Sequence, residues 1–140
     1  MKVLIVEDDL MVADLMEECL TLAEFDVCGI ARSVTAAVEQ IMQSTPDVAI
    51  VDMNLANGSV GTDIAAQVSP SWPFGILYAS GGAASAELSD AEGVAIIAKP
   101  FSMSDMVMAL RVVGDIIAAG STSRPLPRGM RLLQRAPLEA

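Results

Sequence analysis

Five short apolar segments set the strongest limit on how this chain can fold. Most of them are separated by stretches in which apolar residues recur at spacings of three and four, as on one face of a helix. Short apolar runs without polar interruption are typical of strands that are buried on both faces of a sheet. Strands that alternate with helices predict a parallel sheet covered on both sides. The five predicted strands are Val3–Val6, Val27–Ile30, Val48–Val51, Ile76–Ala79 and Val94–Ala98.

The predicted fold is α/β, a doubly wound five-stranded parallel sheet of flavodoxin-like order 2-1-3-4-5 with helices on both faces. Asp9 and Ser33 stand where the first two helices would begin, as capping residues. A third helix would contain Ile64 and Val68 and stop before Pro70. Between the fourth and fifth strands most residues are small or acidic, so a fourth helix there would be short or marginal. The last helix is marked by Met106, Val107, Leu110, Val113 and Ile117.

The composition changes after residue 120. Residues 1–120 carry four basic and seventeen acidic side chains, a net charge of −13, whereas the last twenty residues carry four Arg and one Glu. Pro125 and Pro127 block a helix at the start of this last stretch. We therefore expect one domain over residues 1–120 and a flexible tail over residues 121–140, in which Met130–Arg135 could form one or two helical turns on a partner.

The acidic composition argues against several partners and chemistries. The chain has a net charge of −10 and contains no histidine. An acidic body repels nucleic acid and anionic lipid, so we expect neither as a partner. Without histidine, the chain offers no imidazole for catalysis or metal binding and no phosphohistidine of its own. No apolar run is long enough to span a membrane and the start is unlike a signal peptide, so we expect a cytoplasmic protein.

Polar residues cluster where the predicted strands end. Glu7 and Asp8 follow the first strand and Asp52 follows the third. Ser80 follows the fourth strand and Lys99 the fifth. In open α/β sheets, ligands bind beyond the carboxyl ends of the strands, where the strand order reverses, so these side chains should meet. Taken singly, each could instead be a helix cap, a turn residue or a solvated side chain.

Together, these side chains form a set suited to phosphoryl transfer. Carboxylates with a carbonyl make an oxygen site for Mg²⁺, a hard cation that also binds phosphate oxygens. A central carboxylate, Asp52, can act as a nucleophile toward phosphorus. Lys99 can neutralise phosphoryl oxygens and Ser80 can donate a hydrogen bond to one of them. Positioning and charge compensation of this kind are what phosphoryl transfer asks of a protein.

The motifs at the strand ends carry a family resemblance. Each motif alone is weak, but four in this order, each at a strand end, are specific together. The motifs are Val-Glu-Asp-Asp at 6–9, Val-Asp-Met-Asn-Leu at 51–55, Tyr-Ala-Ser-Gly at 78–81 and Lys-Pro-Phe at 99–101. With them, the chain resembles a bacterial two-component response-regulator receiver domain over residues 1 to about 120.

The resemblance implies the roles of the acidic residues. Asp52 is the expected phosphoacceptor. Asp8 is expected to bind Mg²⁺ directly and Glu7 mainly through water. The backbone carbonyl of Asn54 and the carboxylate of Asp52 are expected to complete the metal site.

The resemblance also covers the other strand ends, with one departure. Ser80 is the expected switch hydroxyl, Lys99 the expected phosphoryl-binding lysine, and the bond from Lys99 to Pro100 is cis in the family. Most receivers carry Tyr or Phe three residues before this lysine, where this chain has Ile96. With Pro73-Phe74 before the fourth strand, the chain resembles in part an alphaproteobacterial receiver subgroup that lacks this aromatic and often occurs beside kinases of the HWE type.

These features imply a stand-alone response regulator of a two-component phosphorelay rather than an enzyme. It would take a phosphoryl group onto Asp52 from a histidine kinase or histidine phosphotransferase. As a monomer or weak dimer, it would then switch the binding of a protein target near the fourth helix and fifth strand. Alternatively, it is a phosphate sink or shuttle. A phosphohydrolase with an aspartate nucleophile is less consistent with the sequence, because such enzymes usually carry Asp-x-Asp and Asn54 stands two residues after Asp52.

Overall fold

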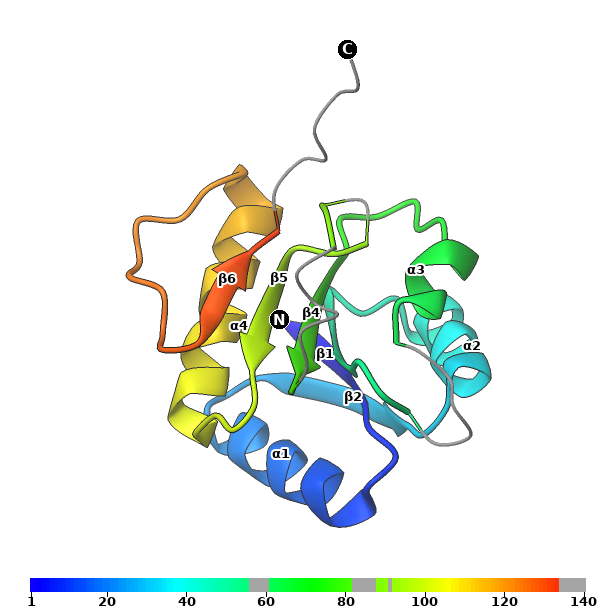
Figure 1. The fold of residues 1–140 in the computed structure, drawn as a ribbon. Coiled ribbons are helices and arrows are strands. Elements are labelled where there is room, and N and C mark those ends of the chain that lie inside the picture. The colour runs from blue at the N-terminus through cyan, green and yellow to red at the C-terminus, as the bar shows by residue number, and fades with distance from the viewer. Residues whose placement is uncertain (56–60, 82–87, 91, 134–140) are drawn as a thin grey trace.

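The computed structural model describes residues 1–55, 61–81, 88–90 and 92–133. Its centre is a six-stranded sheet of order β2-β1-β3-β4-β5-β6, in which β1 to β5 are parallel (Figure 1). The predicted doubly wound α/β fold and its strand order 2-1-3-4-5 are confirmed. The strands are β1 (Lys2–Val6), β2 (Asp26–Ala31), β3 (Val48–Asp52), β4 (Gly75–Ser80), β5 (Ala95–Ala98) and β6 (Met130–Leu132).

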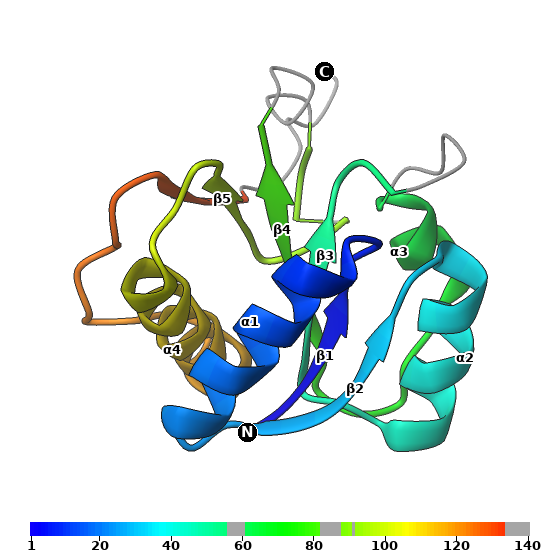
Figure 2. The same ribbon diagram turned by 90° about the horizontal axis from the view of Figure 1, so that it is seen from below.

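Helices cover both faces of the sheet. α1 and α4 pack on one face and α2 and α3 on the other (Figure 2). Each face has its own apolar core because alternate residues of a strand point to opposite sides: Ile50 lies in the α1–α4 core and Val51 in the α2–α3 core. None of the helices that the structure describes is long and apolar enough to cross a membrane. They are α1 (Leu10–Leu22), α2 (Val34–Ser44), α3 (Asp63–Gln67) and α4 (Met103–Ala119).

Side-chain caps start the first two helices where the sequence predicts them. The carboxylate of Asp9 accepts hydrogen bonds from the backbone amides of Met11 at 3.0 Å and Val12 at 3.4 Å. The hydroxyl of Ser33 accepts one from the amide of Ala36 at 3.1 Å. Both predicted caps are therefore confirmed, and the cap at Asp9 fixes the direction in which α1 leaves the end of β1.

The third helix is shorter than expected. α3 ends at Gln67, and Val68, which we expected inside the helix, has an extended backbone. Pro70 has no amide proton to continue a helical hydrogen-bond pattern, and its ring disfavours helical backbone in the residue before it. The chain therefore leaves the helix early and runs toward β4.

The marginal helix expected between β4 and β5 falls largely on residues 82–87 and 91, which lie outside the described residues. The described remainder, 88–90 and 92–94, contains a turn and no helix. Tyr78 on β4 anchors this turn from inside, because its buried hydroxyl donates a hydrogen bond to the carbonyl of Glu92 at 2.6 Å.

The sixth strand corrects the predicted count of five. We expected helical turns over Met130–Arg135, but residues 130–132 form β6, antiparallel to β5. Without it, β5 would be the edge of the sheet and would present unpaired backbone groups. Met130 packs in the α1–α4 core and Leu133 in the α2–α3 core. Residues three apart face opposite sides of an extended chain but the same side of a helix, so burial of both favours the strand.

Candidate functional site

Four strands bring the predicted site residues to one edge of the sheet, which lies at the top of Figure 2. Glu7 and Asp8 directly follow β1, and Asp52 is the last residue of β3. Ser80 ends β4, and Lys99 follows β5. The carboxyl ends of the parallel strands share this edge, as the sequence-based argument required.

Three carboxylates lie within reach of a single cation. Glu7, Asp8 and Asp52 each place one oxygen within 4.8 Å of the others. Glu7 and Asp52 are buried, with exposed fractions of 6% and 8%, and Asp8 is half-buried. Within the described part of the chain, no other group of three His, Cys, Asp or Glu side chains is arranged in this way. Oxygen donors in such a cluster are the ligands that Mg²⁺ prefers.

The crowding of carboxylates changes the protonation of Glu7. The pKa of Glu7 is raised from 4.5 to about 7, and burial is the largest cause. The negative charge of Asp52, and hydrogen bonds from the protonated carboxyl to Asp8 and Asp52, contribute to the rise, whereas the hydrogen bond that the amide of Asp9 donates to Oε2 of Glu7 at 3.3 Å opposes it. The raised pKa means that Glu7 of the folded, metal-free protein keeps its proton at a higher pH than a free carboxyl group. A bound cation would compensate the negative charge of the cluster in place of that proton.

Asp52 is held by two directed contacts. The ammonium of Lys99 lies 3.1 Å from its Oδ1, and the backbone amide of Asn54 donates to the same oxygen at 3.0 Å. The Lys99 side chain is 39% exposed, so it reaches a buried carboxylate from a solvent-accessible position. This arrangement fixes the orientation of Asp52 and places one positive charge beside it. The bond between Lys99 and Pro100 is cis, as the resemblance implies.

Two further residues shape the site, and only one of them, Ser80, was predicted from the sequence. Ser80 is buried at the end of β4, where its carbonyl accepts a hydrogen bond from the amide of Lys99 at 2.8 Å. Gly61 was missed. A Cβ at Gly61 would lie 2.6 Å from the carbonyl oxygen of Asp52, so only glycine fits against the strand there. The sole sequence signal is a glycine near a turn-rich stretch, and that signal does not indicate a packing partner.

An apolar cavity of about 450 Å³ opens beside the carboxylates. Glu7, Asp52 and Lys99 form its polar part. The apolar part lies between α1 and the segment that joins β5 to α4, so a partner that approaches Asp52 meets an apolar surface. The apolar lining comes from Val6, Val12, Met16, Ile50, Ala79, Pro100, Phe101 and Met103.

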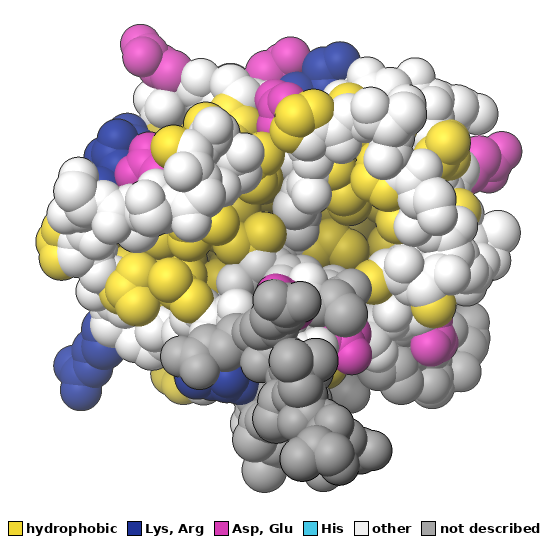
Figure 3. Space-filling view, turned by 90° about the horizontal axis from the view of Figure 1, so that it is seen from above, with side chains coloured by type: hydrophobic (Ala, Val, Ile, Leu, Met, Phe, Trp, Pro, Cys, Tyr) yellow, Lys and Arg dark blue, Asp and Glu magenta, His cyan; other side chains and the backbone are white. Residues whose placement is uncertain are grey.

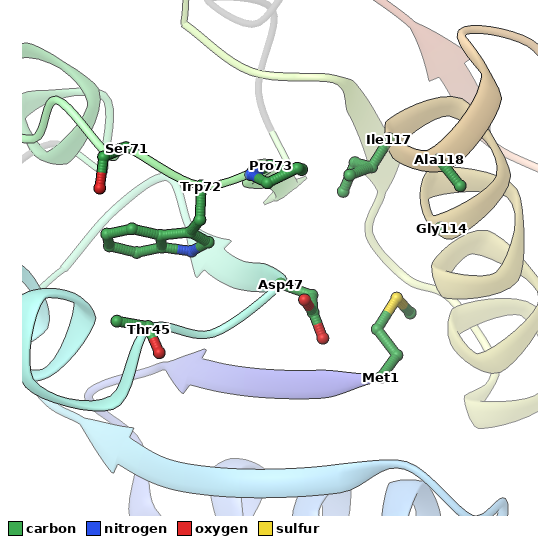
Figure 4. A pocket seen from close by; sticks show the side chains of 9 residues that line it. All are labelled: Met1, Thr45, Asp47, Ser71, Trp72, Pro73, Gly114, Ile117 and Ala118. Atoms are coloured by element: carbon green, nitrogen blue, oxygen red, sulfur yellow. The ribbon is translucent and has the colours of Figure 1, made fainter.

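A wider hollow of about 740 Å³ lies at the opposite end of the strands (Figure 4). It contains Asp47 and Trp72, but their polar groups are engaged by the backbone. Asp47 accepts a hydrogen bond from the amide of Lys2 at 2.7 Å, and the Trp72 indole donates to the carbonyl of Pro46 at 2.7 Å. This hollow therefore lacks the clustered charges of the carboxyl edge.

Comparison with known proteins agrees with this geometry. The family model described as "Response regulator receiver domain" matches residues 3–111. The chain belongs to this family. As a receiver domain, it has the architecture of phosphoacceptor signalling. Receiver domains bind a cation through an acidic cluster, and Glu7, Asp8 and Asp52 are grouped in this structure. The matched segment ends before β6, which is an addition beyond it. No curated protein sequence matches the chain at a significant level.

Solved structures share the receiver fold. The signal receiver domain of a modulated diguanylate cyclase from Desulfovibrio desulfuricans G20 is 22% identical, with a TM-score of 0.70 over 86% of this chain and 98% of that chain. The receiver domain of PhyR from Erythrobacter litoralis is 20% identical, with a TM-score of 0.67 over 89% and 94%. The response regulator PhyR from Brucella abortus is 22% identical, with a TM-score of 0.65 over 85% of this chain but only 52% of that one. At these identities the likeness concerns the fold alone.

Proposed function

We propose that this receiver domain accepts a phosphoryl group on Asp52 from a histidine kinase or histidine phosphotransferase, with Mg²⁺, and so switches the binding of a protein partner. The observation that carries the proposal is the contact of 3.1 Å between the Lys99 ammonium and Asp52, within a cluster of three carboxylates. A structural ion pair needs no such cluster, because adding buried carboxylates around it costs free energy. A site for a cation and a phosphoryl group accounts for all four side chains.

The donor set fits Mg²⁺ on chemical grounds. Glu7, Asp8 and Asp52, with the backbone carbonyl of Asn54, would supply oxygen ligands alone. Burial, and to a smaller extent the charge of Asp52, raises the pKa of Glu7, and a cation would compensate that charge. When bound, Mg²⁺ would supply positive charge to the phosphoryl oxygens.

Each residue would have a defined part in the transfer. An oxygen of Asp52 forms the new bond to phosphorus while the bond from phosphorus to the donor's histidine nitrogen breaks, and its electron pair stays on the imidazole. Lys99 neutralises a phosphoryl oxygen, and the Ser80 hydroxyl donates a hydrogen bond to another. The carboxylate of Asp52 itself is buried, with an exposed fraction of 8%, so its approach to phosphorus is restricted to the open side of the site.

Partners would meet the receiver on two sides. Exposed apolar residues in the first turn of α1, Leu10, Met11 and Val12, adjoin the site and suit a phosphodonor protein. Hollows lined by hydrophobic side chains mark another side of the molecule (Figure 3), one of about 200 Å³ between α3, β4 and the start of β5. A target near the fifth strand would bind there. The edge of β5 itself is paired with β6, which removes it from the surface we expected a target to use.

The experiment is phosphorylation by acetyl phosphate with Mg²⁺, followed by intact-protein mass spectrometry and mapping of the label. The wild type should gain one phosphoryl group on Asp52, and Asp52→Asn should gain none while it keeps its circular dichroism spectrum. Asp26→Asn, an exposed aspartate at the start of β2, is the matched control and should be labelled normally. Equal labelling of the Asp52 variant would refute the assignment.

The role in a relay needs a separate measurement. A sink or shuttle passes label back to a phosphotransferase, whereas a switch shows a phosphorylation-dependent affinity for a target. Hydrolysis of added phosphate monoesters would indicate a phosphohydrolase instead. Asn54 argues against that activity, because it stands where such enzymes usually carry the second acid of Asp-x-Asp.

A further inference from the structure

The backbone of the phosphoryl-binding lysine is held from two sides. On the β4 side, the amide of Lys99 donates to the carbonyl of Ser80 at 2.8 Å. On the β6 side, the amide of Ala98, the residue before it, donates to the carbonyl of Gly129 at 2.9 Å. The lysine side chain is 39% exposed, so these backbone bonds define where its chain starts.

The segment that supplies Gly129 is itself well anchored. At one end, Asp115 on α4 accepts hydrogen bonds from Thr122 at 2.7 Å and from Arg124 at 2.9 Å. At the other end, the amide of Leu133 donates to the carbonyl of Val94 at 2.9 Å. The buried side chains on both faces of β6, described above, hold the segment between these ends. Residues 121–133 are thus a strap over the edge of β5, which we call the β6 strap.

Gly129 is the residue through which the β6 strap touches the site. Its φ of 82° lies in the left-handed region that favours glycine. A Cβ at Gly129 would meet Ala98 no closer than 3.6 Å, which is an ordinary contact, so a larger residue there is opposed by its backbone conformation and not by lack of space. A residue that tolerates a positive φ can therefore be compared at this position with one that does not.

We propose that the β6 strap positions Lys99 for phosphoryl transfer, with the Gly129 carbonyl as the group that holds the end of β5. The inference rests on the proposed function of Asp52. A lysine that must meet a phosphoryl oxygen depends on the placement of its backbone, and a misplacement of 1 Å in a reacting group can cost about a hundredfold in rate. This strap lies beyond the matched family segment, residues 3–111, and replaces the free tail that the sequence led us to expect.

The reaction that tests this is transfer from acetyl phosphate. An Asp52 oxygen forms a bond to phosphorus, the bond from phosphorus to the acetyl oxygen breaks, and acetate leaves with the electron pair. Lys99 gains and loses no proton in this step. Its contribution is charge placement, so displacement of Lys99 should lower the rate constant at saturating Mg²⁺ and donor.

The test compares Gly129→Val with Gly129→Asn. Valine resists positive φ, whereas asparagine adopts it readily. The valine variant should be labelled about tenfold or more slowly, and the asparagine variant at close to the wild-type rate. Arg128→Ala, at an exposed neighbour in the same strap, is the control and should match the wild type.

A double-variant cycle separates positioning from general stability. In a Lys99→Ala background, Gly129→Val should cost less than about twofold, because the residue that the strap positions is gone. Equal losses in both backgrounds would overturn the proposal. Should Gly129→Val fail to fold, Asp115→Ala loosens the other end of the strap and should give a smaller loss that also disappears without Lys99. If the wild type takes no label, the proposed function and this inference fall together; if it is labelled and the strap variants keep its rate, only this inference fails.

Discussion

The two ends of the sheet carry acidic side chains in contrasting surroundings. At the amino end, Asp47 accepts a hydrogen bond from the amide of Lys2, and its own amide donates to the Lys2 carbonyl at 2.8 Å. At the carboxyl end, Glu7, Asp8 and Asp52 crowd together with one ammonium among them. Asp47, engaged by the backbone of Lys2, joins the start of β1 to the start of β3. Acids that crowd each other raise the free energy of the fold, and are retained where they do chemistry.

The largest expected effect concerns the proton on Glu7. Its pKa rises from 4.5 to about 7 on folding, so between these values the folded state holds a proton that the unfolded state has lost. Metal-free stability should therefore fall as the pH rises from about 4.5 to 7, by up to about 3 kcal/mol. Glu7→Gln should remove this fall. Urea unfolding of both proteins in EDTA, at a series of pH values, checks it; identical pH profiles would contradict the burial of an uncompensated acid.

Next in size is the contrast between two lysines at opposite ends. Lys99 contacts Asp52, whereas the Lys2 ammonium donates to the carbonyl of Ser44 at 2.8 Å. Lys99→Ala should slow labelling by acetyl phosphate by about a hundredfold, in the range known for loss of one charge-stabilising group. Lys2→Ala should cost about 1 kcal/mol of stability and leave the labelling rate unchanged. If Lys99→Ala and Lys2→Ala slowed labelling by a similar factor, the carboxyl end of the sheet would not be distinguished from the amino end as the site of phosphorylation.

A smaller effect is expected from Mg²⁺ on thermal stability. A ligand bound only by the native state at ten times its Kd adds about 1.4 kcal/mol. The melting temperature of the wild type should therefore rise with Mg²⁺, measured at pH 8, where Glu7 is ionised. Asp8→Asn should melt higher than the metal-free wild type, because one repelling charge is gone, and should respond less to Mg²⁺. An Asp8 variant with the full Mg²⁺ response would remove Asp8 from the metal site.

The smallest expected effect is at the amino end of the sheet, where a substitution should change stability but not phosphorylation. Trp72 at the amino end donates its indole N–H to the carbonyl of Pro46 and packs edge-on against Phe74, with ring centroids 6.2 Å apart. Trp72→Phe should lower the unfolding free energy by about 1 kcal/mol, the usual net value of a hydrogen bond, and leave phosphorylation unchanged. Slower phosphorylation in a folded Trp72 variant would mean that the amino end also takes part in function.

Much of the site could be predicted from the sequence, because the information is local. Apolar runs mark the strands, and polar residues directly after them must lie at the carboxyl edge once the strands are parallel. Gly61 could not be found in this way. Its role depends on how close its backbone comes to the carbonyl of Asp52, and a sequence does not display distances between segments.

The C-terminal strand β6 also could not be predicted from the sequence. Pro125, Pro127 and the arginines of residues 121–140 indicate an unstructured tail by composition. Met130 and Leu133 become buried only when their segment pairs with β5 at the edge of a formed sheet, which has an apolar core on each face. Edge pairing between segments more than thirty residues apart is decided by what else the edge could bind, which is a property of the assembled fold.

The sequence by itself determined the five parallel strands and the set of residues at their carboxyl edge, because apolar strand segments and polar strand ends are encoded over a few residues. Tertiary structure alone decided the proton on Glu7, the glycine against Asp52 and the strap over β5. Burial, close approach and edge pairing arise when separate segments meet. The raised pKa of Glu7 and the hydrogen bond between Gly129 and Ala98 exist only in the folded chain.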